Sequence, residues 1–258
     1  MKKILIAVAA VIIVVVGFLI LSRPKLDETD AFRILESARA NYSRDNLGGA
    51  LEQFRLLLKK YPKSKYAEES QRFVIYIYEK KQDITGLVAE YERYLKKFRN
   101  TPYTAEFSYK TGYILYKFLS KEKPARVVLI RVVKEYPDSE WTKKSKQLIT
   151  EIYKAKGKND EIIKLAQEYP EKDTDNIPFN ISQMEAYWRE GKHDEAYNIA
   201  KKIPKKTSQI QEHTIYWQLL VKYEPSRENY SGLATAYQKL GFPERAQEYR
   251  KKAAQIKK

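Results

Sequence analysis

Apolar residues recur at helical spacing through most of this chain, and helix start and stop signals divide the pattern into short stretches. Runs that alternate apolar and polar residues are scarce and only 9 glycines are present, so we expect an all-α fold. The connections are short, which is typical of antiparallel neighbours. Helices are predicted at residues 28–43, 47–61, 66–81, 84–98, 104–119, 124–136, 140–156, 160–169, 178–190, 193–203, 208–222, 227–240 and 243–257.

A helix breaker follows an apolar residue at five evenly spaced points, which are Tyr61, Phe98, Tyr136, Tyr169 and Ile203. Neighbouring points are 33 to 38 residues apart. A period of about 34 residues with helical patterning indicates a stack of helix hairpins. Because each hairpin then contacts only its neighbours, the stack grows in one dimension and presents an extended surface for binding.

Two turns carry the clearest local signals. Gly191 and Gly241 each follow a predicted helix, and glycine readily takes the left-handed conformation that ends one. Pro243 suits the first turn of the helix that comes next, because its φ angle is already helical. Small side chains allow the two helices of a hairpin to approach closely, and we expect this role for Ala50, Ala186, Ala196, Ala234 and Ala246.

These turns and alanines resemble the tetratricopeptide repeat. The residues that match its order and spacing best are Leu233, Ala234, Tyr237, Gly241, Ala246 and Ala253, and a second good match is formed by Ala186, Tyr187, Gly191, Ala196 and Ala200. The earlier repeats are degenerate. The resemblance implies a right-handed α-solenoid of about six helix hairpins. The helix at 208–222 is expected to be an unpaired extra, because Gly191 and Gly241 are 50 residues apart.

Residues 30–140 carry a finer resemblance. The segments Lys60–Ala67 and Glu135–Ser139 are similar to repeat junctions of two bacterial envelope proteins. These are the tetratricopeptide lipoprotein of the outer-membrane β-barrel assembly machinery and the periplasmic coordinator of the Tol-Pal system. The likeness implies an extracytoplasmic location and a scaffold that acts through protein contacts. No Cys follows the apolar N-terminal segment, so lipid anchoring is not implied for this chain.

Residues 4–21 are consecutive apolar residues without a charge. As a helix they would be roughly 27 Å long, close to the thickness of the hydrocarbon core of a bilayer. We therefore expect a signal-anchor or transmembrane helix in residues 1–25 and a solenoid in residues 26–258. A cleaved signal peptide is the alternative, but its apolar core is normally shorter, and Ile20 stands where a small residue would be needed.

The charges that flank this segment favour neither orientation by themselves, since Lys2 and Lys3 precede it and Arg23 and Lys25 follow it. A tail of three residues is easily retained in the cytoplasm. We therefore expect a single-pass protein of the inner (cytoplasmic) membrane whose C-terminal domain lies in the periplasm or an equivalent extracytoplasmic space. A body that faces the cytoplasm, as an adaptor of a membrane complex, is an open alternative.

The chain carries 49 Lys and Arg residues against 33 Asp and Glu residues, a formal net charge of +16. The excess is spread along the sequence, and only the last 20 residues are locally dense in bases. Diffuse positive charge favours general attraction to anionic surfaces, so a basic module that binds anionic lipid or an envelope polymer is an alternative function. Nucleic acid is not an expected partner, because no recognition module is present.

The sequence shows little that could support catalysis. No cysteine is present, which excludes disulfides and thiolate chemistry. His193 is expected in a turn where a helix starts and His213 inside a helix, and neither has metal-ligand spacing. The glycines form no phosphate-binding loop. We therefore expect no enzyme activity, no catalytic residues, no metal and no cofactor.

The expected working surface is the concave groove lined by the first helix of each hairpin. Its predicted side chains are Arg72, Tyr76, Glu79, Lys80, Lys117, Glu151, Lys154, Glu185, Trp188, Arg189, Gln238 and Lys239. The resemblance implies that these positions contact other proteins or peptides. Trp188 beside Arg189 is the strongest signal, because exposed Trp and Arg are enriched at binding hot spots. The alternative is that Trp188 only packs against the helix at 208–222.

These patterns together predict a membrane-anchored scaffold that mediates protein–protein interactions in the bacterial cell envelope, in assembly, secretion or division complexes. Its N-terminal helix would hold it at the membrane, and its groove would hold the partners. Such a tether raises the effective concentration of the scaffold near partners in the same membrane.

Overall fold

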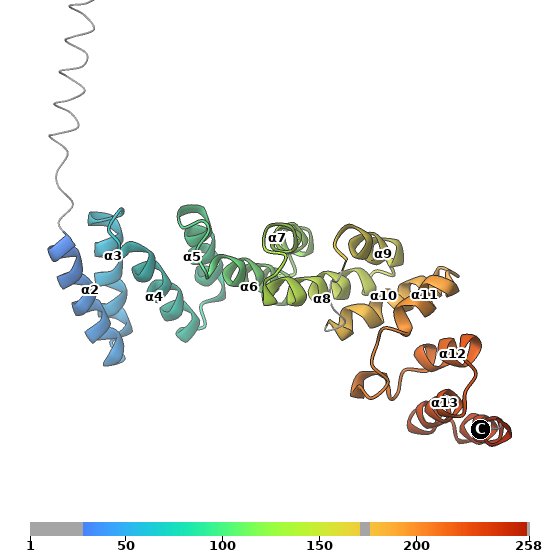
Figure 1. Ribbon diagram of the computed structural model, residues 1–258. Helices are drawn as coiled ribbons and strands as arrows, with labels where there is room; N and C mark the ends of the chain where they lie inside the picture. The colour runs from blue at the N-terminus through green and yellow to red at the C-terminus, as the bar shows by residue number, and fades with distance from the viewer. Residues whose placement is uncertain (1–27, 171–175, 257–258) are drawn as a thin grey trace, which may run out of the picture. The chain divides into compact units, whose positions relative to one another are not determined.

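The computed structural model describes residues 28–170 and 176–256, and the regular elements in these ranges are all helices (Figure 1). The chain divides into two compact units, one that ends at Arg99 (unit 1) and one that begins at Asn100 (unit 2). Within the described ranges, no helix has both the length and the apolar character needed to cross a membrane. The anchor expected in residues 1–25 lies outside the described residues. The right-handed sense of the repeat stack stays a prediction.

The described part of unit 1, residues 28–99, consists of two helix hairpins. The first joins α2 (Glu28–Ser43) to α3 (Leu47–Lys60), the second joins α4 (Ala67–Lys80) to α5 (Ile84–Lys97), and α3 also packs against α4. The apolar faces of the helices meet in a core that includes Leu35, Ala38, Ala50, Phe54, Leu57, Val74 and Ile77. These residues of α2, α3 and α4 recur at helical spacing, and so do the buried Leu87, Tyr91 and Tyr94 of α5. The apolar pattern therefore predicted all four helices closely.

The two hairpin turns of unit 1 are built alike. Asn46 precedes α3, and its side chain accepts a hydrogen bond from the backbone N–H of Gly49 at 3.1 Å. Asp83 precedes α5 and accepts one from Gly86 in the same way at 2.9 Å. Each cap satisfies an N–H group that the first turn of a helix leaves without a partner. The repetition of one turn in both hairpins is the local signature of a repeat.

A buried carboxylate ties the helices of unit 1 together. Glu90 of α5 is 3 % exposed, and its carboxylate accepts hydrogen bonds from Gln71 of α4 (2.9 Å) and from Arg55 of α3 (3.1 Å). A buried carboxylate is costly unless donors surround it. The network therefore holds α3, α4 and α5 in one relative position.

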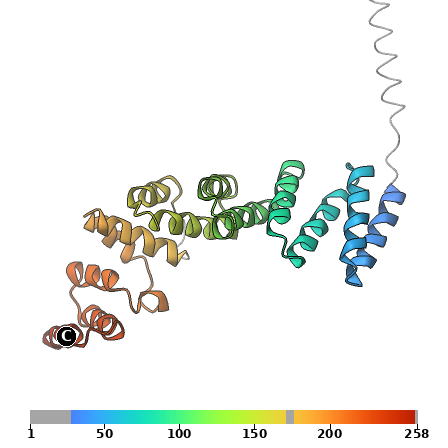
Figure 2. The ribbon, with the colours of Figure 1, turned by 180° about the vertical axis from the view of Figure 1, so that it is seen from behind.

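The described part of unit 2 contains nine α-helices and one short 3-10 helix (Figure 2). They are α6 (Thr104–Lys117), α7 (Glu122–Glu135), α8 (Glu140–Lys154), α9 (Asn159–Glu168), α10 (Ile177–Arg189), α11 (His193–Ala200), η1 (Ser208–Ile210), α12 (Thr214–Tyr223), α13 (Arg227–Lys239) and α14 (Pro243–Gln255). The hairpins are α6/α7, α8/α9, α10/α11 and α13/α14, and the first helices α6, α8 and α10 also pack against one another in this order. With the two hairpins of unit 1, the described residues hold the six that were expected.

Glycine and alanine have the predicted roles in these hairpins. Gly191 and Gly241 end their helices with φ angles of 73° and 80°, in the left-handed region. The predicted crossing alanines, Ala50, Ala186, Ala196, Ala234 and Ala246, are all buried. Gly112 allows an equally close approach of α6 to α7, because a Cβ atom there would lie 2.6 Å from Cγ of Leu129.

The prediction of a single helix at 208–222 is wrong, because the chain turns between η1 and α12. The indole N–H of Trp217 donates to the carbonyl of Ile210 (3.0 Å), and the hydroxyl of Tyr216 donates to the carbonyl of Ile203 (3.0 Å). His213 is therefore not inside a helix. It precedes α12, and its Nδ1 accepts a hydrogen bond from the backbone N–H of Tyr216 at 3.4 Å. These three side chains satisfy backbone groups that the interrupted helix leaves open.

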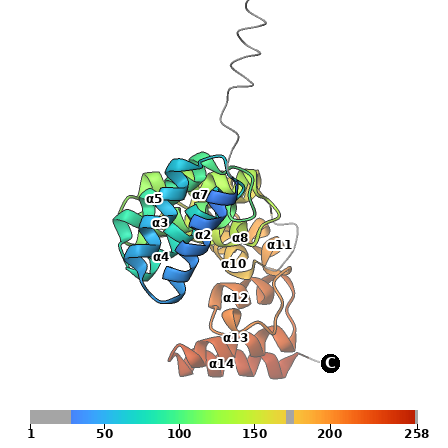
Figure 3. The same cartoon turned by 90° about the vertical axis from the view of Figure 1, so that its left-hand side faces the viewer.

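The helix that follows the break has the predicted unpaired position. α12 packs against α10 and α11 on one side and against α13 on the other, without a hairpin partner of its own. Figure 3 shows α12, α13 and α14 in succession. The extra helix therefore links the terminal hairpin to the preceding ones.

Candidate protein-interaction surface

The first helices of unit 2 bring four predicted site residues together. Lys117 of α6 pairs with Glu151 of α8, and Lys154 of α8 pairs with Glu185 of α10 at 2.6 Å between Nζ and Oε2. The two pairs join three successive first helices, and we call these four residues the ion-paired row. Because each charge has a partner within the row, the row offers little net charge to a ligand.

Glu185 is the most strongly held member of this row. Its carboxylate is 16 % exposed and also lies 2.8 Å from Nε2 of His213. Burial alone would raise the pKa of Glu185, but hydrogen bonds from His213 and Lys154 outweigh burial and lower that pKa to about 2. Glu185 is therefore a carboxylate at neutral pH. Its two donors fix α10 against α8 and against the connection that leads to α12.

Trp188 and Arg189 lie at the end of α10. The ring of Trp188 packs on the ring of His193, with 4.4 Å between centroids, and Trp188 is half-buried against the core of unit 2. Arg189 is exposed. The indole is therefore partly covered by the turn that starts α11, and part of it remains accessible to solvent.

Gln238 and Lys239 at the end of α13 contact other parts of unit 2. The ammonium of Lys239 donates to Oε1 of Gln211 at 2.8 Å, and the side chain of Gln238 accepts from Arg250 of α14 at 3.4 Å. Both side chains are exposed. Neither bonds to the ion-paired row, so the structure does not join them to the other predicted residues.

The remaining predicted residues, Arg72, Tyr76, Glu79 and Lys80, are all on α4 in unit 1. Arg72 pairs with Glu68 one turn earlier at 3.0 Å. Glu79 accepts a hydrogen bond from the hydroxyl of Tyr91 in α5 at 2.6 Å. These two side chains therefore stabilise their own helix and hairpin.

Lys80 and Tyr76 of unit 1 also contact residues of unit 1. Lys80 pairs with Asp45 at 2.7 Å and its ammonium lies over the ring of Tyr42, so it bridges the two hairpins. Tyr76 packs edge-on against Phe73. These contacts of the four α4 residues lead to α2, α4, α5 and the turns of unit 1.

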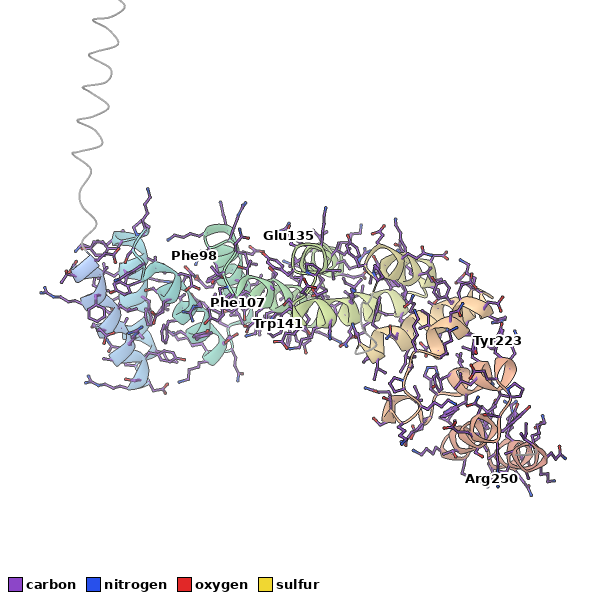
Figure 4. All side chains as sticks on the ribbon, viewed as in Figure 1. Phe98, Phe107, Glu135, Trp141, Tyr223 and Arg250 are labelled. Atoms are coloured by element: carbon purple, nitrogen blue, oxygen red, sulfur yellow. The ribbon has the colours of Figure 1, made fainter. Side chains whose placement is uncertain are left out.

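An aromatic row on α6 and α8 was missed by the sequence analysis. Tyr109 lies between Tyr113 and Trp141, with centroid distances of 6.1 and 5.4 Å, and Tyr113 lies 6.2 Å from Phe118. Phe118 is 59 % exposed, Tyr113 is also exposed, and Trp141 is labelled in Figure 4 near the start of α8. The ammonium of Lys144 covers one face of Trp141 at 3.8 Å. We call Tyr109, Tyr113, Phe118 and Trp141 the aromatic row.

A signal for this row was present in the sequence. Tyr109, Tyr113 and Lys117 are spaced by four residues, so they share one face of α6. Lys117 was assigned to the groove, and the same spacing assigns the two tyrosines to it as well. Their spacing alone was not decisive, because tyrosine also packs between helices, as the buried Tyr91 and Tyr94 do in unit 1.

A cavity of about 530 Å³ lies elsewhere in unit 2, where α7 and α9 end beside α8. Its lining includes Val133, Thr142, Lys146 and Tyr169. None of the predicted site residues lines it. Within residues 28–170 and 176–256, no cluster of three or more His, Cys, Asp or Glu side chains could hold a metal ion.

Comparison with solved structures finds several similar chains. A tetratricopeptide repeat protein from Parabacteroides merdae is 14 % identical, with 89 % of this chain and 94 % of that chain covered and a TM-score of 0.46. MamA is 13 % identical over 84 % of this chain and 92 % of its own, with a TM-score of 0.38. YrrB, described as a TPR protein with an unusual peptide-binding site, is 17 % identical, with 88 % and 86 % covered and a TM-score of 0.33.

No curated protein matches the chain. The profile of one protein family matches residues 27–160, which is more than half of the 258 residues. That family is described as YfiO, outer membrane lipoprotein. The match covers the hairpins of unit 1 and the first hairpin and a half of unit 2. The repeat resemblance seen in the sequence is thus confirmed, and the chain belongs to the YfiO outer membrane lipoprotein family.

Proposed function

We propose that this chain is a membrane-anchored tetratricopeptide scaffold of the bacterial cell envelope, which gathers proteins of assembly, secretion or division complexes. Its membership of an outer membrane lipoprotein family is the observation that carries the proposal. A stack of helix hairpins is suited to binding, because it presents an extended and rigid face. Since the chain contains no Cys, we assign its attachment to the apolar segment at 4–21 instead of a lipid.

The surface that we assign to partners is the first-helix face of unit 2, which carries the aromatic row and the ion-paired row. Tyrosine and tryptophan offer a large contact area and lose little side-chain entropy on binding. The adjacent charges already have partners. We therefore expect the bound segment to contribute apolar or aromatic side chains, and the ion-paired row to hold the helices in place.

Salt dependence and substitution together test this assignment. A cross-linker at position 113 first captures and identifies an envelope partner. The free partner should then bind this protein at physiological salt. The substitutions Trp141→Ala and Trp188→Ala should each weaken that binding. Val127→Ala is the matched control, because Val127 is 61 % exposed on the second helix α7. Loss of binding between low and physiological salt would contradict the proposal and support a basic module for anionic lipid or polymer.

The side of the membrane on which the body lies is a separate test. In the proposal the body is extracytoplasmic, so externally added protease should digest it in spheroplasts, and a reporter fused after residue 258 should be active only outside the cytoplasm. Protection from protease in intact spheroplasts would contradict the envelope assignment and favour an adaptor that faces the cytoplasm.

A further inference from the structure

One edge of unit 1 gathers exposed bases. α3 and α5 each end with two lysines in the last turn, a position that suits the negative end of a helix dipole. Further bases follow in the connections after these helices. We call the whole set the basic edge, and its members, all exposed, are Lys59, Lys60, Lys63, Lys65, Lys96, Lys97 and Arg99.

Contacts between helix ends place these bases beside the starts of α2 and α4. The hydroxyl of Ser64, in the connection from α3 to α4, donates to Oε2 of Glu28 at 2.7 Å. The hydroxyl of Tyr94, near the end of α5, bonds to Glu68 in the first turn of α4. The ends of α3 and α5 therefore lie at the same edge as the starts of α2 and α4 (Figure 1).

The carboxylates at this edge do not neutralise the bases. Glu69 bonds to Arg39 of α2, and Glu68 bonds to Arg72 of α4. Only Lys60, among the seven bases, has a carboxylate partner within the described residues, which is Asp30 at 2.8 Å. Six cationic side chains thus face solvent without an ion-pair partner in the described part of the chain, and the seven bases outnumber the described carboxylates of this edge, which are Glu28, Asp30, Glu68 and Glu69.

The opposite edge of unit 1 is balanced. It holds the two hairpin turns and the end of α4, where the bases Arg44, Lys80 and Lys81 are matched in number by the acids Asp45, Glu79 and Asp83. Unit 1 is therefore electrically asymmetric along the direction of its helices. Bases that serve only to keep the surface hydrated could be distributed over both edges. A surface that approaches an anionic layer from one side needs its excess bases on that side.

We propose that the basic edge docks on anionic lipid headgroups of the membrane that holds the N-terminal segment, an inference that rests on the membrane tether of the proposed function. Only residues 22–27 separate the apolar segment from Glu28, and six residues span at most about 20 Å. The tether therefore joins unit 1 at the basic edge. At physiological salt, lysines and arginines attract an anionic surface only within about one Debye length, roughly 8 Å, which this tether permits.

Docking at this edge has a geometric consequence. The four helices of unit 1 run between the basic edge and the opposite edge, so docking makes them stand upright on the bilayer. Lys65 and Lys81 lie just before and just after α4, and both are exposed. They are about 20 Å apart along the helix axis, so they should differ in their distance to the lipid.

The absence of native cysteines allows a direct test of that difference. Full-length protein with a fluorophore on Lys65→Cys, or on Lys81→Cys, is reconstituted in vesicles that contain phosphatidylglycerol and lipids with spin-labelled headgroups. Quenching at position 65 should exceed quenching at position 81 by about threefold, and the ratio should approach one in vesicles of phosphatidylcholine or at high salt. Equal quenching at the two positions in anionic vesicles would overturn the proposal.

A charge variant and its control complete the experiment. Replacement of Lys59, Lys63, Lys96 and Arg99 by Gln should bring the ratio close to one. The control replaces four exposed bases of unit 2 by Gln, namely Lys123, Arg131, Lys134 and Lys164, and should leave the ratio unchanged. Flotation with vesicles of either lipid reports the tether separately. If the protein floats but shows no quenching difference, the tether is present and the basic edge does not dock. If the protein fails to float, both the membrane tether and the docking proposal are contradicted.

Discussion

The aromatic row and the ion-paired row of unit 2 lie on the same first helices but have different roles. In the ion-paired row, each charged side chain is bonded to another helix, and Glu185 has two donors. In the aromatic row, Tyr113 and Phe118 contact each other and remain exposed. The comparison indicates that the ion-paired row stabilises the stack of first helices, whereas the aromatic row keeps exposed ring surface, which the proposed partner surface requires.

The largest expected effect concerns the stability that Glu185 contributes. Its folded-state pKa of about 2 lies below the ordinary value of 4.5, so this stabilisation is complete above about pH 5 and is lost as pH falls toward 2. The shift corresponds to about 3 kcal/mol, at about 1.4 kcal/mol per pKa unit. Urea unfolding of the wild type and of Glu185→Gln at several pH values measures it.

The two proteins should differ by this amount at pH 7 and converge only below about pH 2, the folded-state pKa. Glu151→Gln is the control in the same row, because Glu151 is half exposed and its pair is solvated. A constant difference between wild type and Glu185→Gln across this pH range would show that the Glu185 carboxylate does not fix the first helices.

The next effect concerns binding by the aromatic row. Trp141→Ala should weaken the affinity for a partner by about thirtyfold, roughly 2 kcal/mol, as buried aromatic residues at hot spots do. Calorimetric titration with the cross-linked partner measures this loss. Under conditions in which the Glu185→Gln protein is folded, its affinity for the partner should be close to that of the wild type. A loss of affinity in Glu185→Gln without a loss in Trp141→Ala would contradict this assignment and indicate that the ion-paired row binds the partner.

A third, smaller effect tests the helix approach that supports the aromatic row. In Gly112→Ala the new Cβ would lie 2.6 Å from Cγ of Leu129, so α6 and α7 must separate or Leu129 must move. We expect a loss of about 1–2 kcal/mol, the strain of overpacking less the gain in helix propensity. Gly48→Ala meets no such contact and should be neutral or slightly stabilising in the same thermal melts. Equal effects of the two changes would contradict the close approach.

The smallest effect is expected at the exposed end of the ion-paired row. Lys117→Ala removes a pair whose side chains are 34 % and 50 % exposed, and such pairs contribute less than about 1 kcal/mol. Denaturant unfolding at low and high salt measures it, and the small loss should vanish at high salt. A loss as large as that of Glu185→Gln would mean that exposure does not distinguish the members of the row.

Most of the fold could be predicted from sequence because its signals are local. Apolar spacing, turn residues such as Asn46 and Gly191, and the prolines define each helix within one hairpin. The break between η1 and α12 could not be predicted in this way. It depends on Trp217 and Tyr216 reaching carbonyl groups at Ile210 and Ile203, and the apolar pattern does not show where an aromatic side chain donates its hydrogen bond.

The candidate site could be predicted only in part. Helical spacing placed Lys117, Glu151, Lys154 and Glu185 on one face, but it did not show that they pair across helices. That pairing depends on the relative position of successive hairpins. The spacing of Tyr109 and Tyr113 carried the same information as that of Lys117, and it was not used because tyrosine occurs both in seams and on binding faces.

Gly112 has a consequence for the order in which structure forms. A glycine in the middle of a helix lowers intrinsic helicity by about 1 kcal/mol, and α6 on its own is only 14 residues long. The segment that forms α6 should therefore become helical only when it packs against α7. A synthetic peptide of residues 104–117 would be largely random coil in water, and it would become helical only when it associates with its neighbour.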